Sequence, residues 1–264
     1  MNLNDLQRNW NQLGKQDPLW AVISYPDKKG GKWTPEQFFQ MGKDDISQFF
    51  QYLSKLGVVI PRWHALDFGC GVGRLTQAMA ASFDKVAGVD IAPSMIKLAQ
   101  QYNRFEGRCR YYLNERDDLA LFKDNSFDLV FSLITLQHIH PQYVRRYLAE
   151  FLRVLVPGGV LYFQLPSRYL GSEDTRGSSD GHHETVATGH GIRALVKNVM
   201  PEPLRQLYRT VRDWKNEPIM EMYGIERSEV ESLLKKHKGV LVDVVETLST
   251  LSKWESFCYC VTKL

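Results

Sequence analysis

The spacing of apolar residues divides the chain into a helical first part and a later part in which strands and helices alternate. In the first part, apolar residues recur at helical spacing over Asn4–Leu13 and from Thr34 to Gly57, and both stretches are predicted to be helices. Thr34 is a good N-cap, and the proline after it suits the first helical position. The stretch between them, 17–33, contains Asp-Pro, Pro-Asp and Gly-Gly pairs and is predicted to be a loop.

From residue 65 onward, short apolar runs alternate with amphipathic helical stretches. This pattern predicts strand–helix–strand units, and therefore a parallel sheet with helices on its faces. The last two apolar runs are also predicted to be strands. The predicted strands are 65–68, 86–89, 109–113, the run ending at 132, the run ending at 164, 240–245 and 256–262. The predicted helices of this part are 74–81, the stretch from 93, 142–155 and 226–238.

The stretch Ala65–Asp90, ALDFGCGVGRLTQAMAASFDKVAGVD, is the most informative part of the sequence. An apolar strand runs into three glycines at alternate positions, a helix follows, and a second strand ends in an acid. Glycines at this point let the backbone approach a ligand at the carboxyl edge of a parallel sheet. The stretch therefore predicts a ligand site at this edge, and a tight turn that holds no ligand is the alternative.

Two features of this loop bear on which ligand it binds. The dinucleotide fingerprint G-x-G-x-x-G has an acid about 20 residues downstream, and Asp90 fits that acid, but the third glycine here comes one place early. Asp67, at the mouth of the loop, would repel a pyrophosphate and attract a cation. These features favour S-adenosylmethionine, which carries a sulfonium and an ammonium and no phosphate, over NAD.

The run D-F-G-C-G-V-G-R followed by G-V-D-I-A-P-S-M resembles motif I and the ribose-binding acid of class I S-adenosylmethionine-dependent methyltransferases. The later runs D-N-S-F-D-L-V and V-P-G-G also resemble this family, and the first of them is typical of its small-molecule, type 11 group. The resemblance covers 63–164 strongly and 223–264 weakly. It implies a Rossmann-like, doubly wound α/β fold with a seven-stranded, mostly parallel sheet and an antiparallel last strand. The last two predicted strands would pair as the antiparallel hairpin that closes this sheet. It also implies S-adenosyl-L-methionine as the cofactor and S-adenosyl-L-homocysteine as the product.

The same resemblance implies which side chains contact the cofactor. Ile91 and Met95 are expected near the adenine and ribose, although a methionine at helical spacing is equally expected in the core. The adenine edge is expected to meet Asn114 or Asp117, whose side chains can accept from the exocyclic amine. The chain from Ser132 onward is expected beside the methionine end. The expected cofactor-binding residues are Asp67, Gly69, Cys70, Gly71, Arg74, Asp90, Ile91, Met95, Asn114, Asp117, Ser132, Leu133 and Gln137.

The resemblance also divides the chain into three parts. A methyltransferase core is expected over 58–165 and 226–264, a helical and loop cap over 1–57, and an inserted lid over 166–225 that recognises the acceptor. Members of the family often use such a cap to cover the cofactor, and packing of its aromatic residues onto the sheet is the alternative. The candidate cap contacts are Tyr25, Trp33 and Phe38.

The inserted segment itself has few readable features. Residues 171–191 are rich in Gly, Ser, Thr and His without periodicity and are predicted to form a mobile loop. Apolar residues recur at helical spacing over 204–214 beside a row of arginines, which predicts a helix whose basic face is solvated, grips an anion or meets a membrane surface. The spacing of His182, His183 and His190 matches no standard metal site, so no metal is expected.

Composition and charge narrow the protein class. The chain has 264 residues, with 44% hydrophobic and 24% charged, which is ordinary for a soluble globular protein of one large domain with an insertion. A formal net charge of +3 is too small to indicate nucleic acid by itself. Its four cysteines form no C-x-x-C pair, which argues against structural zinc. The first residues lack a signal-peptide profile and no apolar run could span a bilayer, so a cytoplasmic location is expected.

The chemistry implied by this cofactor makes modest demands on the protein. Methyl transfer from a sulfonium is an in-line displacement with a neutral leaving group, so the protein mainly aligns the reactants and excludes water. A base is needed only where the acceptor must lose a proton, and His138 and His182 are the candidates, followed by His140 and His183. The expected function is methyl transfer to an O-, N- or C-nucleophile of a small molecule. The alternatives are an RNA methyltransferase, an NAD-type dehydrogenase, and a protein that binds the cofactor without catalysis.

Overall fold

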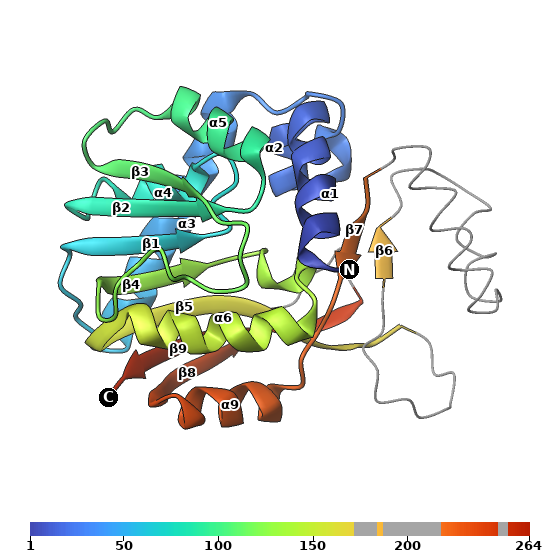
Figure 1. Cartoon of the computed structure of the whole chain (residues 1–264). Coiled ribbons are helices and arrows are strands. Elements are labelled where there is room, and N and C mark those ends of the chain that lie inside the picture. Colours follow the sequence, from blue (N-terminus) through green and yellow to red (C-terminus); the bar gives the residue numbers. More distant parts are fainter. Residues whose placement is uncertain (172–183, 187–217, 248–252) are drawn as a thin grey trace.

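The computed structural model describes residues 1–171, 184–186, 218–247 and 253–264, and a seven-stranded sheet forms its centre (Figure 1). The strand order is β3-β2-β1-β4-β5-β9-β8. The strands of this sheet are β1 (His64–Phe68), β2 (Lys85–Asp90), β3 (Cys109–Leu113), β4 (Phe127–Ser132), β5 (Leu155–Tyr169), β8 (Gly239–Glu246) and β9 (Trp254–Lys263). The predicted seven-stranded α/β sheet is confirmed.

The direction of the strands places the ligand site. Strands β1 to β5 pair with one another in parallel, whereas β9 runs antiparallel to both β5 and β8. The predicted antiparallel last strand and the C-terminal hairpin are therefore confirmed. From β1 the chain first adds β2 and β3 on one side and then β4 and β5 on the other. In open parallel sheets, ligands bind at such a reversal, outside the carboxyl ends of the strands.

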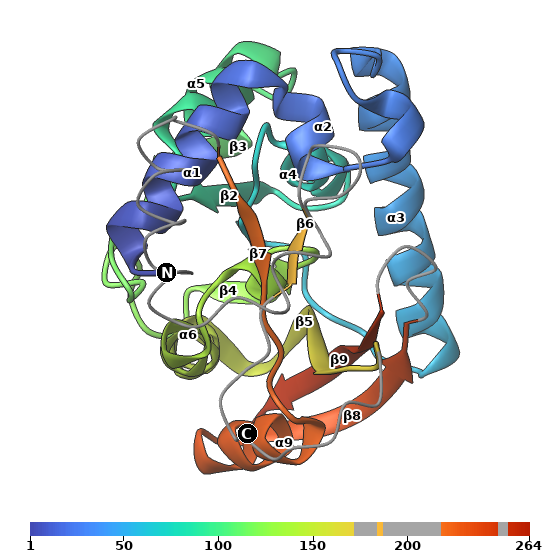
Figure 2. The ribbon, with the colours of Figure 1, turned by 90° about the vertical axis from the view of Figure 1, so that its right-hand side faces the viewer.

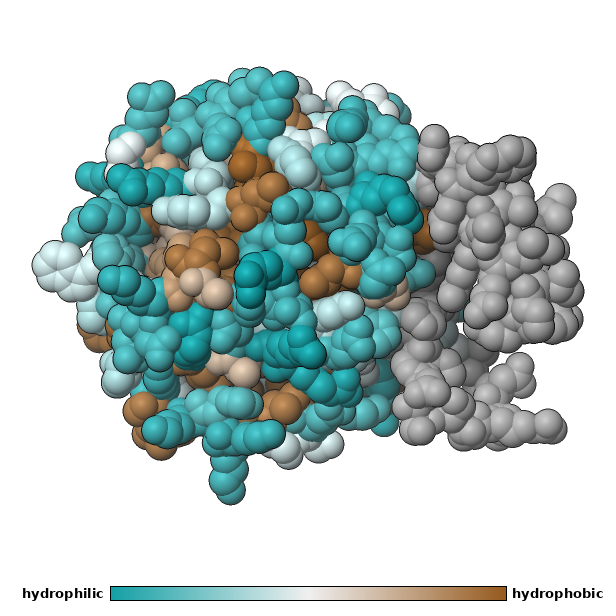
Figure 3. Space-filling model, in the orientation of Figure 1, coloured by the Kyte–Doolittle hydropathy of each residue, from teal (hydrophilic) through white to brown (hydrophobic). Residues whose placement is uncertain are grey.

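Helices cover both faces of the sheet, and Figure 2 shows α3 and α6 on opposite sides of it. On one side, Phe49 and Leu53 of α3 pack with Phe131 of β4. On the other side, Phe151 of α6 and Leu234 of α9 pack with β-strand residues. The α-helices are α1 (Leu3–Gln16), α2 (Pro18–Val22), α3 (Pro35–Lys55), α4 (Arg74–Met79), α5 (Pro93–Tyr102), α6 (Pro141–Val154) and α9 (Arg227–Lys236). Two short 3₁₀ helices are η1 (Pro26–Lys28) and η2 (Leu136–His138). Hydrophilic side chains dominate the outer surface in the view of Figure 3.

The N-terminal part agrees with most of the sequence predictions. The helix predicted over 4–13 is α1, and the cap of α3 is as expected, since Thr34 Oγ1 accepts from Gln37 N at 3.3 Å. The prediction of a continuous loop over 17–33 is wrong, because Pro18 begins the short helix α2. Proline suits that first helical position, and the buried Leu19, Trp20 and Ala21 anchor this single turn in the core.

The inserted segment is described only near its ends. Strand β6 (Glu184–Val186) pairs antiparallel with β7 (Met220–Met222), so the loop predicted over 171–191 contains a strand. The predicted helix over 204–214 lies outside the described residues, as do His182, His183 and His190. The division of the chain at residues 57, 165 and 225 stays a prediction. In the part of the chain that the structure describes, no helix is long and apolar enough to cross a membrane.

Candidate functional site

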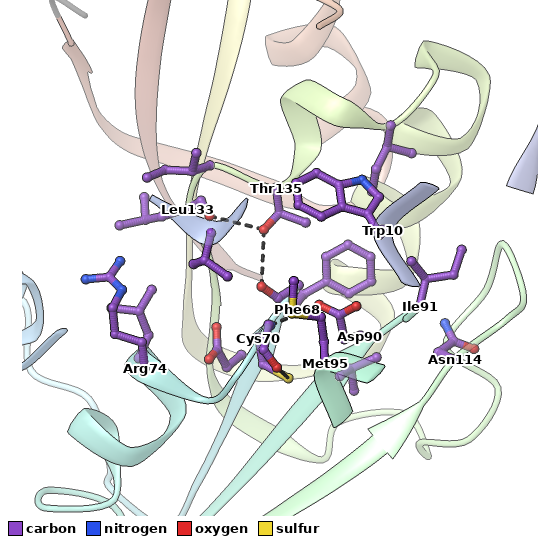
Figure 4. A pocket seen from close by; sticks show the side chains of 18 of the residues that line it. Trp10, Phe68, Cys70, Arg74, Asp90, Ile91, Met95, Asn114, Leu133 and Thr135 are labelled. Atoms are coloured by element: carbon purple, nitrogen blue, oxygen red, sulfur yellow. Dashed lines mark hydrogen bonds between the residues drawn. The ribbon is translucent and has the colours of Figure 1, made fainter. Parts of the chain in front are cut away.

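A cavity lies at the carboxyl edge of β1 and β2, beneath the N-terminal helices. The space among its lining residues is about 880 Å³, a figure that includes the open mouth. Figure 4 shows Arg74 and Leu133 on one side of it and Ile91 and Asn114 on the other. The lining residues are Leu6, Trp10, Val22, Asp67, Phe68, Gly69, Cys70, Gly71, Arg74, Leu75, Val89, Asp90, Ile91, Met95, Asn114, Leu133, Ile134, Thr135, Ile139 and Tyr147.

The glycine loop after β1 forms the floor of this cavity. Gly69 N and Cys70 N both donate to the carbonyl oxygen of Val89, at 2.8 and 2.9 Å, which ties the loop to the end of β2. Gly69 and Gly71 have φ angles of +76° and +52°, a region that favours glycine. A Cβ on Gly69 would lie 2.1 Å from the side chain of Thr135, so there is no space for one. The loop therefore needs glycine for both its backbone angles and its close packing.

Asp90 is held at the end of β2 by two backbone amides. Its Oδ2 accepts from Gly71 N at 2.9 Å, and its Oδ1 accepts from Ala92 N at 2.8 Å. Burial raises the pKa of this carboxyl, and the two amides oppose that effect. A carboxylate has about four acceptor positions, so two remain for a ligand. This arrangement suits a pair of hydroxyl groups, as expected for the ribose-binding acid.

Asp67, the penultimate residue of β1, lies near Arg74 and is 2% exposed. Thr76 Oγ1 donates to its Oδ2 at 2.6 Å. Burial raises the pKa of Asp67 to about 6, while the Thr76 hydrogen bond and the charge of Arg74 act against that rise. The carboxyl is therefore mostly ionised at neutral pH, and a cationic ligand would hold it in that form.

Arg74 begins α4 and reaches the same end of the cavity. Its guanidinium forms an ion pair with Asp45 of α3, and its side chain is 4% exposed. Its Nε is buried without a hydrogen-bond partner among the described residues. Such a buried donor carries a desolvation cost, which an acceptor on a bound ligand would offset.

The N-terminal helices form the roof of the cavity through different residues from those predicted. Trp33 and Phe38 are buried in a separate cluster with Val72, and Tyr25 is exposed. Instead, Leu6 and Trp10 of α1 line the cavity. Their spacing of four on an amphipathic helix was visible in the sequence, but that pattern does not indicate what the apolar face covers.

Two contacts fix this roof to the floor. Gln7 Nε2 donates to the carbonyl oxygen of Ile91 at 3.2 Å, which links α1 to the chain after β2. The side chain of Val22, at the end of α2, lies so close to Gly71 that an added Cβ would meet it at 2.7 Å. The cap is therefore in direct contact with the glycine loop.

Ten of the thirteen expected cofactor-binding residues line the cavity: Asp67, Gly69, Cys70, Gly71, Arg74, Asp90, Ile91, Met95, Asn114 and Leu133. Asp117, Ser132 and Gln137 are not among the lining residues. Asp117 forms an ion pair with Arg146. The hydroxyl of Ser132 is fully buried and donates to the carbonyl oxygen of Phe68 at 3.0 Å, so it joins β4 to β1. Between the two residues considered for the adenine edge, the structure places Asn114 in the cavity.

His138, the expected base, is buried behind the cavity wall. Its ring lies edge-on to Trp10, with the ring centroids 5.1 Å apart. Its Nδ1 lies 2.8 Å from the carbonyl oxygen of Glu221, and its Nε2 lies 3.0 Å from Gln137 Nε2. Burial lowers the pKa of the imidazole to about 4, so the ring is neutral and a weak proton acceptor at pH 7. These features do not favour the catalytic role predicted for it.

In the wall formed after β4, the sequence analysis named Leu133 but not the two residues that follow it. Ile134 and Thr135 line the cavity, and Thr135 Oγ1 donates to the carbonyl oxygen of Leu133 at 3.1 Å. Tyr147 of α6 also lines it, and its hydroxyl donates to the carbonyl oxygen of Arg116 at 2.5 Å. For Ile134 and Thr135, the available signal in the sequence was their position directly after the end of a predicted strand.

The cavity, the loop and the strand order agree with a family comparison. Residues 66–163 match the family model described as a methyltransferase domain. This segment is similar to that domain. It contains the glycine loop, Asp90, Asn114 and the wall after β4, whereas the roof residues of α1 and α2 lie outside it.

The chain is also similar to curated relatives and to solved structures. The ubiquinone biosynthesis O-methyltransferase of Xanthomonas campestris is 33% identical over 113 residues, which are 42% of this chain and 46% of that protein. The match thus spans about half the length of such relatives. The magnesium protoporphyrin IX methyltransferase from Synechocystis, solved with bound SAH, has a TM-score of 0.64 at 16% identity and covers 99% of both chains. A methyltransferase from Clostridium acetobutylicum has a TM-score of 0.56 at 18% identity, covering 85% of this chain and 92% of that one. At these identities, the two structures establish the shared fold.

Proposed function

We propose that this chain transfers a methyl group from S-adenosylmethionine to a small-molecule acceptor. The observation that carries the proposal is the grouping of Asp67, the glycine loop and Asp90 around one cavity at the strand reversal. The names of the relatives support it, since one acts in ubiquinone biosynthesis and another is a magnesium protoporphyrin IX methyltransferase. A reducing compartment such as the cytoplasm suits the four cysteines, all of which are buried and outside any disulfide.

The residues of the cavity suit the parts of this cofactor. Asp90 has acceptor positions for the ribose hydroxyls, and Asn114 lies at the same end for the adenine edge. At the other end, Asp67 would attract the ammonium, and the unpartnered Nε of Arg74 would donate to the carboxylate. When bound, the sulfonium supplies the methyl group. The protein's own contribution is then to bind, to orient and to exclude water, with α1 as the roof.

The acceptor is proposed to meet the segment 166–225, whose exit strand β7 lies beside η2. A small molecule is favoured over RNA because the net charge is only +3 and no RNA-binding module is recognised in the sequence. RNA binding that falls steeply with salt would favour the alternative. An NAD-type dehydrogenase is disfavoured by Asp67, which would face the pyrophosphate.

The direct test is calorimetric titration with S-adenosylmethionine and S-adenosylhomocysteine, with NAD as the control. We expect micromolar binding of the first two and none of NAD. Turnover with a panel of phenolic, carboxylic and amine acceptors would then separate an enzyme from a protein that only binds the cofactor. If the protein bound neither S-adenosylmethionine nor S-adenosylhomocysteine, the proposal would be contradicted.

Cofactor affinity is expected to fall as the pH drops through 6. Protonated Asp67 cannot pair with an ammonium, so with a pKa of about 6 the affinity should be about tenfold lower at pH 5 than at pH 7. Calorimetry at both pH values in two buffers of different ionisation enthalpy would also detect proton release on binding near pH 6. Asp67→Asn is the control, because its remaining pH dependence reports the contribution of Asp90. Equal affinities of the wild type at pH 5 and pH 7 would rule out this role.

A further inference from the structure

A chain of hydrogen bonds runs from the cavity wall to strand β7. It begins at Ile134, whose backbone N–H donates to Gln164 Oε1 at 3.2 Å. Gln164 Nε2 then donates to Gln137 Oε1 at 3.3 Å, and Gln137 Nε2 lies 3.0 Å from His138 Nε2. Finally, His138 Nδ1 lies 2.8 Å from the carbonyl oxygen of Glu221 in β7. These links connect a wall residue to the exit strand of the inserted segment.

The backbone groups at the two ends give this chain a single direction. The N–H of Ile134 can only donate, and the carbonyl of Glu221 can only accept. His138 therefore carries its proton on Nδ1 and offers a lone pair on Nε2, and Gln137 must turn its NH₂ group toward that lone pair. Each glutamine then presents its oxygen toward Ile134 and its NH₂ group toward Glu221. The burial that lowers the pKa of His138 keeps the imidazole in this neutral form.

The bend at the start of this chain has an unfavourable backbone conformation. Ile134 has a φ of +58°, which is disfavoured for a β-branched residue. Its side chain is 43% exposed, so burial of that side chain does not compensate. The hydrogen bonds of Ile134 N to Gln164 and of Thr135 Oγ1 to Leu133 O hold the bend instead. A strained residue in a cavity wall indicates a functional constraint on that wall.

We propose that Gln164 and His138 are positioning residues. They hold the bend 133–135, and with it one end of the cavity, in a fixed position relative to β7. Thr135 of this bend packs against Gly69, two residues after Asp67, whereas Asn114 lines the other end (Figure 4). The inference rests on the proposed function, which places the methionine part of the cofactor at the Asp67 end. Because β7 leaves the segment proposed to recognise the acceptor, the chain of hydrogen bonds links the acceptor side of the site to the cofactor side.

The test replaces Gln164 by methionine, which is unbranched and similar in size but has no amide. Wild type and Gln164→Met are titrated with S-adenosylmethionine and with 5′-methylthioadenosine, which has the adenosine part and lacks the amino acid part. We expect the affinity of Gln164→Met for S-adenosylmethionine to fall about tenfold, and its affinity for 5′-methylthioadenosine to fall less than about twofold. Gln101→Met, on the exposed side of α5, is the matched control and should change neither of the two affinities. The proposal would be overturned if Gln164→Met lost affinity equally for the two ligands, or if it lost no affinity for either of them.

A second readout of Gln164→Met needs no ligand. In the wild type, Gln164 fixes the amide of Gln137 with its NH₂ group toward His138 Nε2, which opposes protonation there. Without Gln164, that amide can rotate and offer its oxygen to a protonated Nε2. We therefore expect the pKa of His138, measured by nitrogen-15 NMR, to rise by about 1 unit. An unchanged pKa would refute the directional chain.

A second variant covers the case in which Gln164→Met does not fold. Gln137→Met removes the middle amide, and the same selective loss of affinity and the same rise of the His138 pKa are expected. Failure of the proposed function is distinguishable, because wild-type protein would then bind neither adenosine ligand while the NMR titration would still test the chain of hydrogen bonds.

Discussion

Replacement of Asp90 by alanine is expected to weaken S-adenosylmethionine binding by about 100-fold. The reason is the loss of two hydrogen bonds from the ribose hydroxyls to a carboxylate, worth about 1.5 kcal/mol each. The carboxylate is already oriented by Gly71 N and Ala92 N, so little ordering cost offsets its contribution to binding. Calorimetric titration of the wild type and the variant measures the effect.

The control for this prediction is Asp84→Ala, which removes an exposed carboxylate just before the other end of β2. It changes the net charge equally and should leave the affinity unaltered. Because Asp90→Ala also removes an acceptor from two backbone amides, circular dichroism must show that the variant is folded at the titration temperature. A folded Asp90→Ala protein with wild-type affinity would remove this residue from the site.

Replacement of Gly69 by alanine is expected to reduce cofactor binding beyond detection, by more than about 100-fold. Gly69 has a φ of +76°, and an added Cβ would lie 2.1 Å from Thr135 Cγ2. The loop or the wall must therefore move, and both line the cavity. Equilibrium dialysis with labelled S-adenosylmethionine measures the loss, and thermal unfolding measures the accompanying change in stability.

Gly107→Ala provides the matched control for the backbone part of this effect. Gly107 has a φ of +87°, and nothing lies within 4 Å of an added Cβ there. The substitution should therefore cost only the left-handed backbone penalty, about 1–2 kcal/mol of stability, and leave binding intact. If Gly69→Ala binds the cofactor as well as Gly107→Ala does, close packing against Thr135 is unimportant.

The cavity is lined partly by the segment that matches the family model and partly by residues outside that segment. The matched residues 66–163 supply the glycine loop, Asp90 and the wall after β4. The roof comes from α1 and α2, through Leu6, Trp10 and Val22. The matched segment therefore does not supply the whole lining of the cavity.

The polar residues near the carboxyl edge have two different roles. Asp67, Asp90 and Asn114 line the cavity, although the amide of Asn114 also donates to the carbonyl oxygen of Asp118. Ser132 and Gln137 do not line it and form hydrogen bonds with other parts of the protein. All five lie at the ends of predicted strands or in the segments that follow them. The sequence pattern therefore does not distinguish residues that line the cavity from residues that do not. Which of them face the ligand depends on how neighbouring strands and η2 pack against one another.

The sequence by itself determined the sheet and the ligand loop. The sequence predicts strand β3 over its full extent, and it contains the glycine loop with its two acids as a recognisable pattern. These features are local, because the apolar period, the positive φ angles and an acid at a strand end involve residues close together in the chain.

The tertiary structure decided which surfaces meet. An amphipathic helix such as α1 has an apolar face that could cover many partners, and only packing placed Leu6 and Trp10 over the cavity. Packing also buried His138 beside Trp10 and Glu221, and this burial lowers the pKa of its imidazole. Burial and pKa depend on neighbours from distant parts of the chain, and no local pattern specifies them.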